Sequence, residues 1–117
     1  MVVHPGERVQ VVFVNRLPEA TSIHWHGLIV PNDVDGVPEI GAGPVIRSGE
    51  TYVYDFVPRQ AGTFMYHAHT MDAKQEMMGL AGMIVSLARQ PMTHREYVIL
   101  LQVWAVQTEG GMDMADM

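Results

Sequence analysis

The residues most able to do chemistry in this sequence are four histidines, arranged in two pairs. They are His24, His26, His67 and His69. Side chains two positions apart in a β-strand share a face, roughly 6–7 Å from each other. One such pair is too widely spaced to chelate a single ion, but two strands placed side by side would gather four imidazoles. Imidazole binds copper, zinc, iron and nickel, so the residue types predict a metal site without selecting the metal.

Both pairs lie in apolar segments that read as β-strands, over residues 22–30 and 63–69. Burying an imidazole without a polar partner costs roughly 1–3 kcal/mol, so four of them in such strands favour a ligand role over ordinary half-buried histidines. Because side chains alternate along a strand, Trp25 must point away from His24 and His26 and into the core.

The remaining elements are short and mostly extended. Strands are expected over 9–15, 51–57, 82–87 and 96–106, and a short helix over 71–79. Residues 31–50 contain three prolines and four glycines and are expected to form a long ordered loop, a kind of segment that is usually functional. Short strands separated by turn signals predict an all-β sandwich or barrel.

Composition excludes several other classes of protein. The 117 residues include 7 basic and 13 acidic ones, for a net charge of −6, and no cysteine. The acidic balance argues against a nucleic-acid partner, and no apolar run approaches the ~20 residues of a membrane span. The absence of cysteine removes disulfides and thiolate chemistry, and no hydrolase motif is present. No export leader is visible at the start of the sequence.

Four motifs together resemble the first cupredoxin domain of the multicopper oxidases, a family that includes laccases and bacterial copper-efflux oxidases. They are HWHG (24–27), VDGVP (34–38), GTFMYHAH (62–69) and GLAGMIV (79–85). The resemblance implies a cupredoxin-like Greek-key β-sandwich or barrel over residues 1–88, shortened at its N-terminus and carrying one short helix. Residues 89–95 would be a linker. Residues 96–117 would be either the start of a second cupredoxin domain or an edge strand followed by a flexible Met-rich tail.

The resemblance also implies a role for each histidine. His24 would bind the type-2 copper, His26 and His67 would share one type-3 copper, and His69 would bind the other. In the family these three coppers reduce O₂ to water while phenols or metal ions are oxidised. Asp35 would assist proton delivery near the type-2 copper, although an Asp-Gly pair is also an ordinary turn.

The sequence departs from the family pattern in two ways. A trinuclear site needs eight histidines and this chain supplies four, so we expect the others from a C-terminal cupredoxin domain or from another chain. The type-1 blue copper needs a cysteine, so the chain has no type-1 site and is not expected to be active alone. An open sheet edge could be closed by residues 96–106 of the same chain or of a neighbouring chain, and the second case would give an oligomer. The resemblance further implies a periplasmic or extracellular location.

Two other interpretations of the histidines remain open. The chain could be a stand-alone cupredoxin module that stores or transfers copper without oxidase activity. A structural zinc site is less consistent with the sequence, because such sites are closed, tetrahedral and commonly use cysteine.

Overall fold

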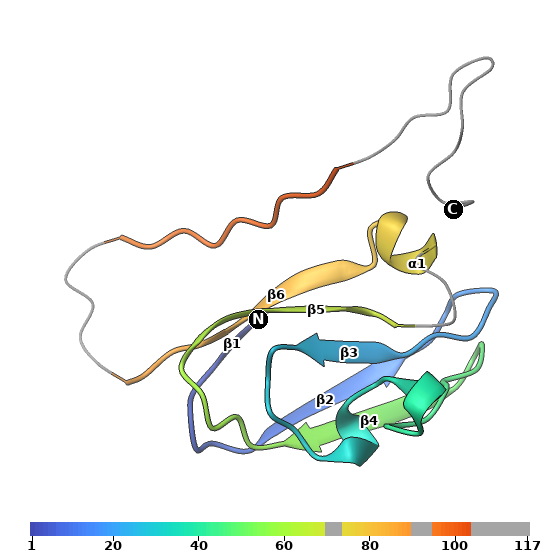
Figure 1. The fold of residues 1–117 in the computed structure, drawn as a ribbon, viewed down its shortest axis with the longest axis horizontal. Helices are drawn as coiled ribbons and strands as arrows, with labels where there is room; N and C mark the ends of the chain where they lie inside the picture. Colours follow the sequence, from blue (N-terminus) through green and yellow to red (C-terminus); the bar gives the residue numbers. More distant parts are fainter. Residues whose placement is uncertain (70–73, 90–94, 104–117) are drawn as a thin grey trace.

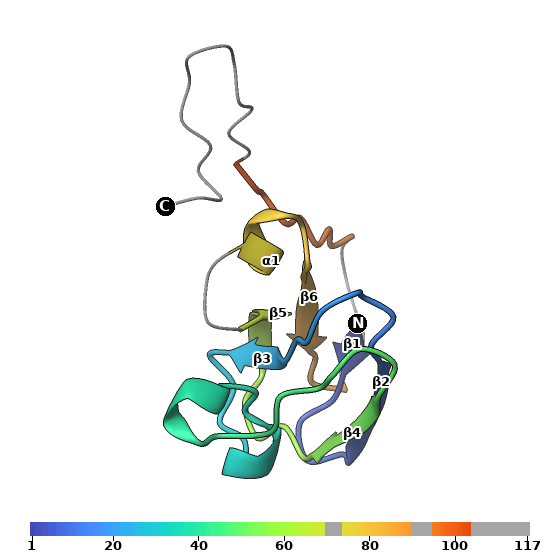
Figure 2. The ribbon, with the colours of Figure 1, turned by 90° about the vertical axis from the view of Figure 1, so that its right-hand side faces the viewer.

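The structure is a computed structural model that describes residues 1–69, 74–89 and 95–103. Its strands form two sheets that stack as layers (Figures 1 and 2). The larger sheet has the strand order β1-β6-β5-β3, formed by β1 (Val2–Val3), β6 (Ala81–Ser86), β5 (Gly62–Ala68) and β3 (Ile23–His26). The smaller sheet pairs β2 (Val9–Val14) with β4 (Thr51–Phe56) in antiparallel orientation. The expectation of an all-β fold is therefore confirmed.

The core lies between the two sheets and follows the alternation of side chains along each strand. Trp25 from β3, Ile84 from β6, and Tyr54 and Phe56 from β4 are all buried there. On β2 the alternate residues Val9, Val11 and Phe13 pack against this cluster, as the period of two predicts. The same alternation leaves the opposite face of the larger sheet to the histidines of β3 and β5.

Strand β3 is shorter than the sequence indicated, ending at His26 instead of continuing to residue 30. Gly27 has a φ of +91°, which turns the chain out of the sheet. The backbone groups that follow make hydrogen bonds to the Gln60 side chain instead of to a neighbouring strand. Gln60 accepts a hydrogen bond from the Ile29 amide at 2.8 Å and donates one to the Gly27 carbonyl at 3.0 Å. The apolar residues after Gly27 therefore pack as a loop.

Two further differences concern the ends of the described chain. Strand β1 is not predicted from the sequence; its two residues pair in parallel with Val85 and Ser86 of β6. Residues 95–103 form no strand, so the strand expected over 96–106 is wrong for this part. Its Leu101 and Val103 side chains are each 86% exposed, and the segment runs past β6 and α1 without joining either sheet (Figure 1). An extended segment becomes a strand only when a neighbour pairs with its backbone.

Among the residues that the structure describes, the connections contain three short helices. The loop over 31–50 holds two 3₁₀ turns, η1 (Asn32–Val34) and η2 (Pro38–Ile40), and the helix expected over 71–79 is described as α1 (Lys74–Met77). Most of the expected linker, residues 90–94, and the Met-rich tail at 104–117 lie outside the described residues. Within the part of the chain that the structure describes, no helix is long and apolar enough to cross a membrane.

Candidate metal centre

The register between β3 and β5 brings the two histidine pairs together. The strands are antiparallel, with His24 opposite His67 and Trp25 opposite Tyr66. Trp25 is 1% exposed, and its ring centroid lies 5.1 Å from that of Phe56 and 5.6 Å from that of Tyr54. The predicted inward orientation of Trp25 is confirmed, and it fixes the rotation of β3 so that its histidines face the other way.

Three of the imidazoles form a compact cluster. One ring nitrogen from each of His24, His26 and His67 lies within 4.8 Å of the others. The closest approach joins His26 Nδ1 to His67 Nε2 at 3.2 Å. His69 stands beside this group, with its ring centroid 5.4 Å from that of His24 and 5.9 Å from that of His67. The structure thus gathers all four predicted histidines on one face, with three of them in the tightest set.

His24 is held by the loop that follows its own strand. Its Nδ1 lies 2.7 Å from the carbonyl oxygen of Asp35 and 3.4 Å from the Asp35 carboxylate. A carbonyl oxygen only accepts, so the proton of a neutral His24 sits on Nδ1 and its Nε2 is unprotonated. The loop can lie this close because residue 36 is a glycine: a Cβ there would stand 1.8 Å from the carbonyl oxygen of Ile23. The structure therefore places Asp35 directly beside His24.

The two histidines of the second pair are held in the same way by other partners. His67 Nδ1 lies 2.9 Å from the carbonyl oxygen of Ala68 and 3.5 Å from a carboxylate oxygen of Glu76. His69 Nδ1 lies 3.2 Å from a carboxylate oxygen of Glu39. These acceptors also place the proton on Nδ1 and leave Nε2 unprotonated. For His26 the nitrogen that faces the cluster is Nδ1.

Glu39 and Glu76, which lie beside His69 and His67, are not predicted from the sequence as members of the histidine cluster's surroundings. Glu39 lies in η2, four residues after Asp35, and Glu76 lies in α1, seven residues after His69. The sequence does show that each is an acidic residue in a connection directly adjoining a histidine strand, and this pattern could have marked both as candidates. The spacing did not show that the two carboxylates turn back toward the imidazoles.

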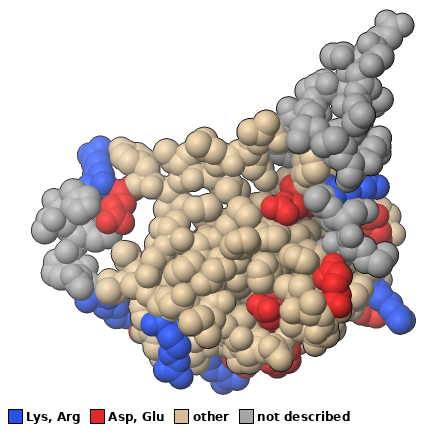
Figure 3. Space-filling view, viewed as in Figure 1, with Lys and Arg blue, Asp and Glu red and all other residues tan. Residues whose placement is uncertain are grey.

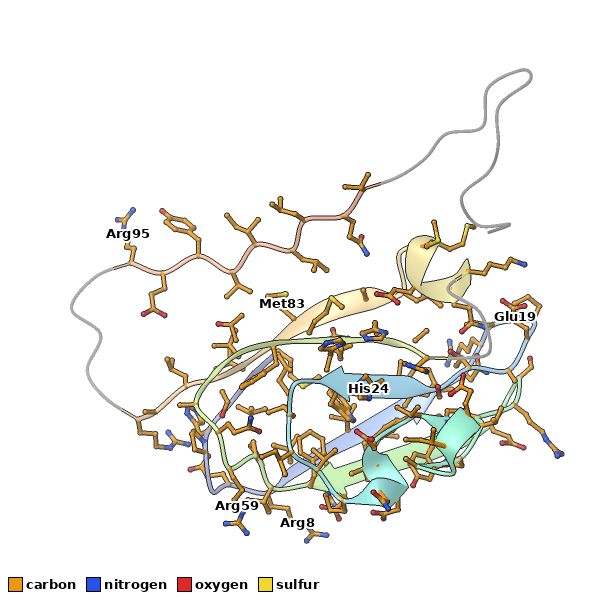
Figure 4. All side chains as sticks on the ribbon, in the orientation of Figure 1. Arg8, Glu19, His24, Arg59, Met83 and Arg95 are labelled. Carbon is orange, nitrogen blue, oxygen red and sulfur yellow. The ribbon has the colours of Figure 1, made fainter. Side chains whose placement is uncertain are left out.

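The surroundings of the cluster favour a cation. Figure 4 shows His24 on β3 between the 3₁₀ turns and α1, the elements that carry these carboxylates. In the space-filling view, the middle of this face carries acidic and uncharged side chains, and the basic side chains lie around its margin (Figure 3). Negative charge beside neutral imidazoles stabilises a bound positive ion.

The donor set fits a metal ion that takes nitrogen ligands. Two nitrogens at about 2.0 Å from one ion in a tetrahedral arrangement are about 3.3 Å apart, close to the 3.2 Å between His26 Nδ1 and His67 Nε2. Without an ion the same separation accommodates an N–H···N hydrogen bond. Imidazole nitrogens, with carboxylates on the far side of the rings, suit copper or zinc.

Comparison with known proteins identifies the family. The multicopper oxidase family matches residues 1–91. A copper resistance protein A homolog of Pseudomonas syringae pv. tomato is 43% identical over 103 residues, which cover 86% of this chain and 17% of that protein. Copper resistance protein A of Escherichia coli is 42% identical over 102 residues, covering 85% and 16% of the two chains. The chain therefore spans about one sixth of the length of these relatives.

Solved structures give the same result. A multi-copper oxidase from Pseudomonas thermotolerans superimposes with a TM-score of 0.75 at 38% identity, over 81% of this chain and 23% of that one. A multicopper oxidase from Campylobacter jejuni, described as a metallo-oxidase, gives a TM-score of 0.68 at 42% identity, over 76% and 19%. The expected cupredoxin-like fold is confirmed, and the copper that this family uses suits the histidine cluster. By sequence and by fold, the chain belongs to the multicopper oxidase family.

Proposed function

We propose that the chain supplies four of the eight histidine ligands of a type-2/type-3 trinuclear copper site. His24 binds the type-2 copper through Nε2, His26 and His67 bind one type-3 copper through Nδ1 and Nε2, and His69 binds the other through Nε2. The observation that carries this proposal is the convergence of His26 Nδ1 and His67 Nε2 to 3.2 Å. The hydrogen bonds on Nδ1 of the other three rings support the choice of Nε2 as their ligand atom.

The chain's own part in the chemistry is to hold these nitrogens in place and to handle protons. When bound, the three coppers supply the four-electron reduction of O₂ to water. His26 must release its Nδ1 proton before that nitrogen can bind an ion, and its ring is exposed to solvent, which can take the proton. We also propose that Asp35 assists proton delivery near the type-2 copper; its half-buried carboxylate lies 3.4 Å from Nδ1 of His24, the proposed ligand of that copper.

The remaining ligands come from a partner. A C-terminal cupredoxin domain or another chain would bring four more histidines and the cysteine of a type-1 site, a residue that this sequence lacks. The chain by itself is then inactive toward phenols or metal ions, because electrons have no type-1 copper through which to enter. We also propose a periplasmic or extracellular location, in line with the family resemblance of its motifs.

Copper binding to the purified 117-residue chain tests the proposal. We expect weak binding, measured by competition with a chelator of known affinity, and no O₂ consumption with a phenol. The double variant His26→Ala/His69→Ala should abolish this binding while the far-UV circular dichroism stays the same. His4→Ala is a matched control, because His4 Nδ1 bonds to the Leu87 carbonyl at 2.6 Å, away from the cluster. Equal binding by the double variant would refute the site. Tight binding of one or two coppers by the chain alone would instead support a storage or transfer module.

A further inference from the structure

Glu39 differs from the other residues that contact the imidazoles. The Nδ1 atoms of His24 and His67 each lie within 2.9 Å of a backbone carbonyl, which stays in place whatever the nearby side chains are. For His69, the acceptor that the structure gives to Nδ1 is the Glu39 carboxylate, at 3.2 Å. The orientation of His69 therefore depends on a side chain, and a substitution can remove that side chain.

The backbone of the turn that carries Glu39 is conformationally restrained. Pro38 occupies the first position of η2 with its fixed φ, and Gly41 closes the turn at a φ of +74°. Val37 and Ala42 flank the turn and exchange two backbone hydrogen bonds, of 2.8 and 3.1 Å. The backbone on both sides of Glu39 is therefore fixed, and its carboxylate is presented from a rigid hairpin.

His69 is tied to the same loop through Ser22. The Ser22 hydroxyl is buried between two backbone carbonyls, 2.7 Å from that of His69 and 3.0 Å from that of Gly36. The His69 amide donates to the Ser22 carbonyl at 3.3 Å. The backbone of His69 is thus anchored, and the rotation of its ring is the remaining freedom that Glu39 restricts.

We propose that Glu39 is a positioning residue of the copper site. Its carboxylate accepts a hydrogen bond from the Nδ1–H of His69. Nε2, with its lone pair, then faces the type-3 copper that His69 binds. This inference rests on the proposed function for the role of Nε2, but the effect of Glu39 on the His69 ring stands without a metal. A carboxylate, a histidine and a metal in series is a frequent arrangement, in which the carboxylate fixes the tautomer and the ring orientation.

The expected loss of copper affinity depends on how exposed the Glu39 and His69 side chains are. The Glu39 and His69 side chains are 33% and 38% exposed, so water competes for the hydrogen bond. Loss of such an outer partner typically weakens metal binding by about 10–100-fold. We expect the lower end of this range for Glu39→Ala, an affinity for copper reduced by about 10-fold.

The test compares three variants of the 117-residue chain. Glu39→Ala removes the acceptor, Glu39→Gln keeps an acceptor oxygen without the charge, and Ile40→Ala trims a neighbouring side chain of the same turn that is 76% exposed. Long-range ¹H–¹⁵N NMR of the metal-free chain reports the tautomer of each histidine, at a pH well above the ordinary histidine pKa of about 6.5. Chelator competition reports the affinity for Cu²⁺.

The expected results separate positioning from other effects. Glu39→Ala shifts His69 toward the Nε2–H tautomer and weakens copper binding, Glu39→Gln keeps most of the Nδ1–H tautomer and of the affinity, and Ile40→Ala changes neither. An unchanged tautomer in Glu39→Ala, or equal losses in Glu39→Ala and Ile40→Ala, would overturn the proposal. If the parent chain binds no copper, the proposed function fails, while the tautomer of His69 still decides the role of Glu39.

Discussion

The hydroxyl of Tyr54 connects the smaller sheet to the strand that carries the first histidine pair. Tyr54 is fully buried, and its Oη accepts a hydrogen bond from the Ile23 amide at 2.9 Å, at the start of β3. Replacing Tyr54 with Phe leaves the ring contacts in place but leaves the Ile23 N–H without a partner. A buried donor without a partner costs about 1–3 kcal/mol, and because Ile23 is only half-buried we expect about 1–2 kcal/mol.

Urea denaturation followed by far-UV circular dichroism measures this loss. With an m-value of about 1–3 kcal/mol/M for a small domain, the unfolding midpoint should fall by roughly 1 M. Tyr52→Phe is a matched control on the same strand, because the Tyr52 hydroxyl donates to the Asp33 carbonyl at 2.6 Å in an exposed position. A loss in Tyr54→Phe no larger than in Tyr52→Phe would refute the argument that the Ile23 amide depends on Tyr54.

The same residue predicts a pH dependence. Burial raises the pKa of Tyr54 from 10.0 to about 12, although the hydrogen bond from Ile23 opposes the shift. Because the folded state holds this proton more tightly than the unfolded state does, the contribution to stability is complete below pH 10. It is lost as the pH rises from about 10 toward 12. The stability difference between the parent chain and Tyr54→Phe should therefore narrow over this range, and a constant difference would contradict the assignment.

Three further predictions concern other parts of the molecule. Gly36→Ala should unfold the chain or prevent copper binding, measured by circular dichroism and chelator competition, because the new Cβ would meet the Ile23 carbonyl at 1.8 Å. Asp55→Asn should cost stability near neutral pH. The hydrogen bond from Arg8 lowers the Asp55 pKa from 3.8 to about 2, so the difference from the parent chain should vanish as the pH falls from about 4 to about 2. Cu²⁺ at 100 times its Kd should raise the free energy of unfolding by about 2.7 kcal/mol, and His67→Ala should remove this gain in a thermal melt.

The sequence could predict which side chains share a face but not what lies across from them. The alternation around Trp25 places His24 and His26 on one face whatever the neighbouring strand is. The register that sets His24 opposite His67 depends on how two strands far apart in the sequence are paired, and no local pattern specifies it. For the same reason the sequence does not predict β1, since two valines become a strand only where β6 pairs with them. The predicted first histidine strand is longer than β3, since Gln60 replaces the strand partner of the residues after Gly27.

The loop over 31–50 explains why a strand scaffold alone would not make this site. Strands β3 and β5 bring the imidazoles within reach, but strand geometry leaves each ring free to rotate about its side-chain bonds. The loop supplies the missing restraint through two short turns, with the Asp35 carbonyl bonded to His24 and the Glu39 carboxylate bonded to His69. Its glycines allow the close approach, as the 1.8 Å clash expected at Gly36 demonstrates. At this site the loop over 31–50, folded back onto the sheet, therefore orients two of the four imidazoles, those of His24 and His69.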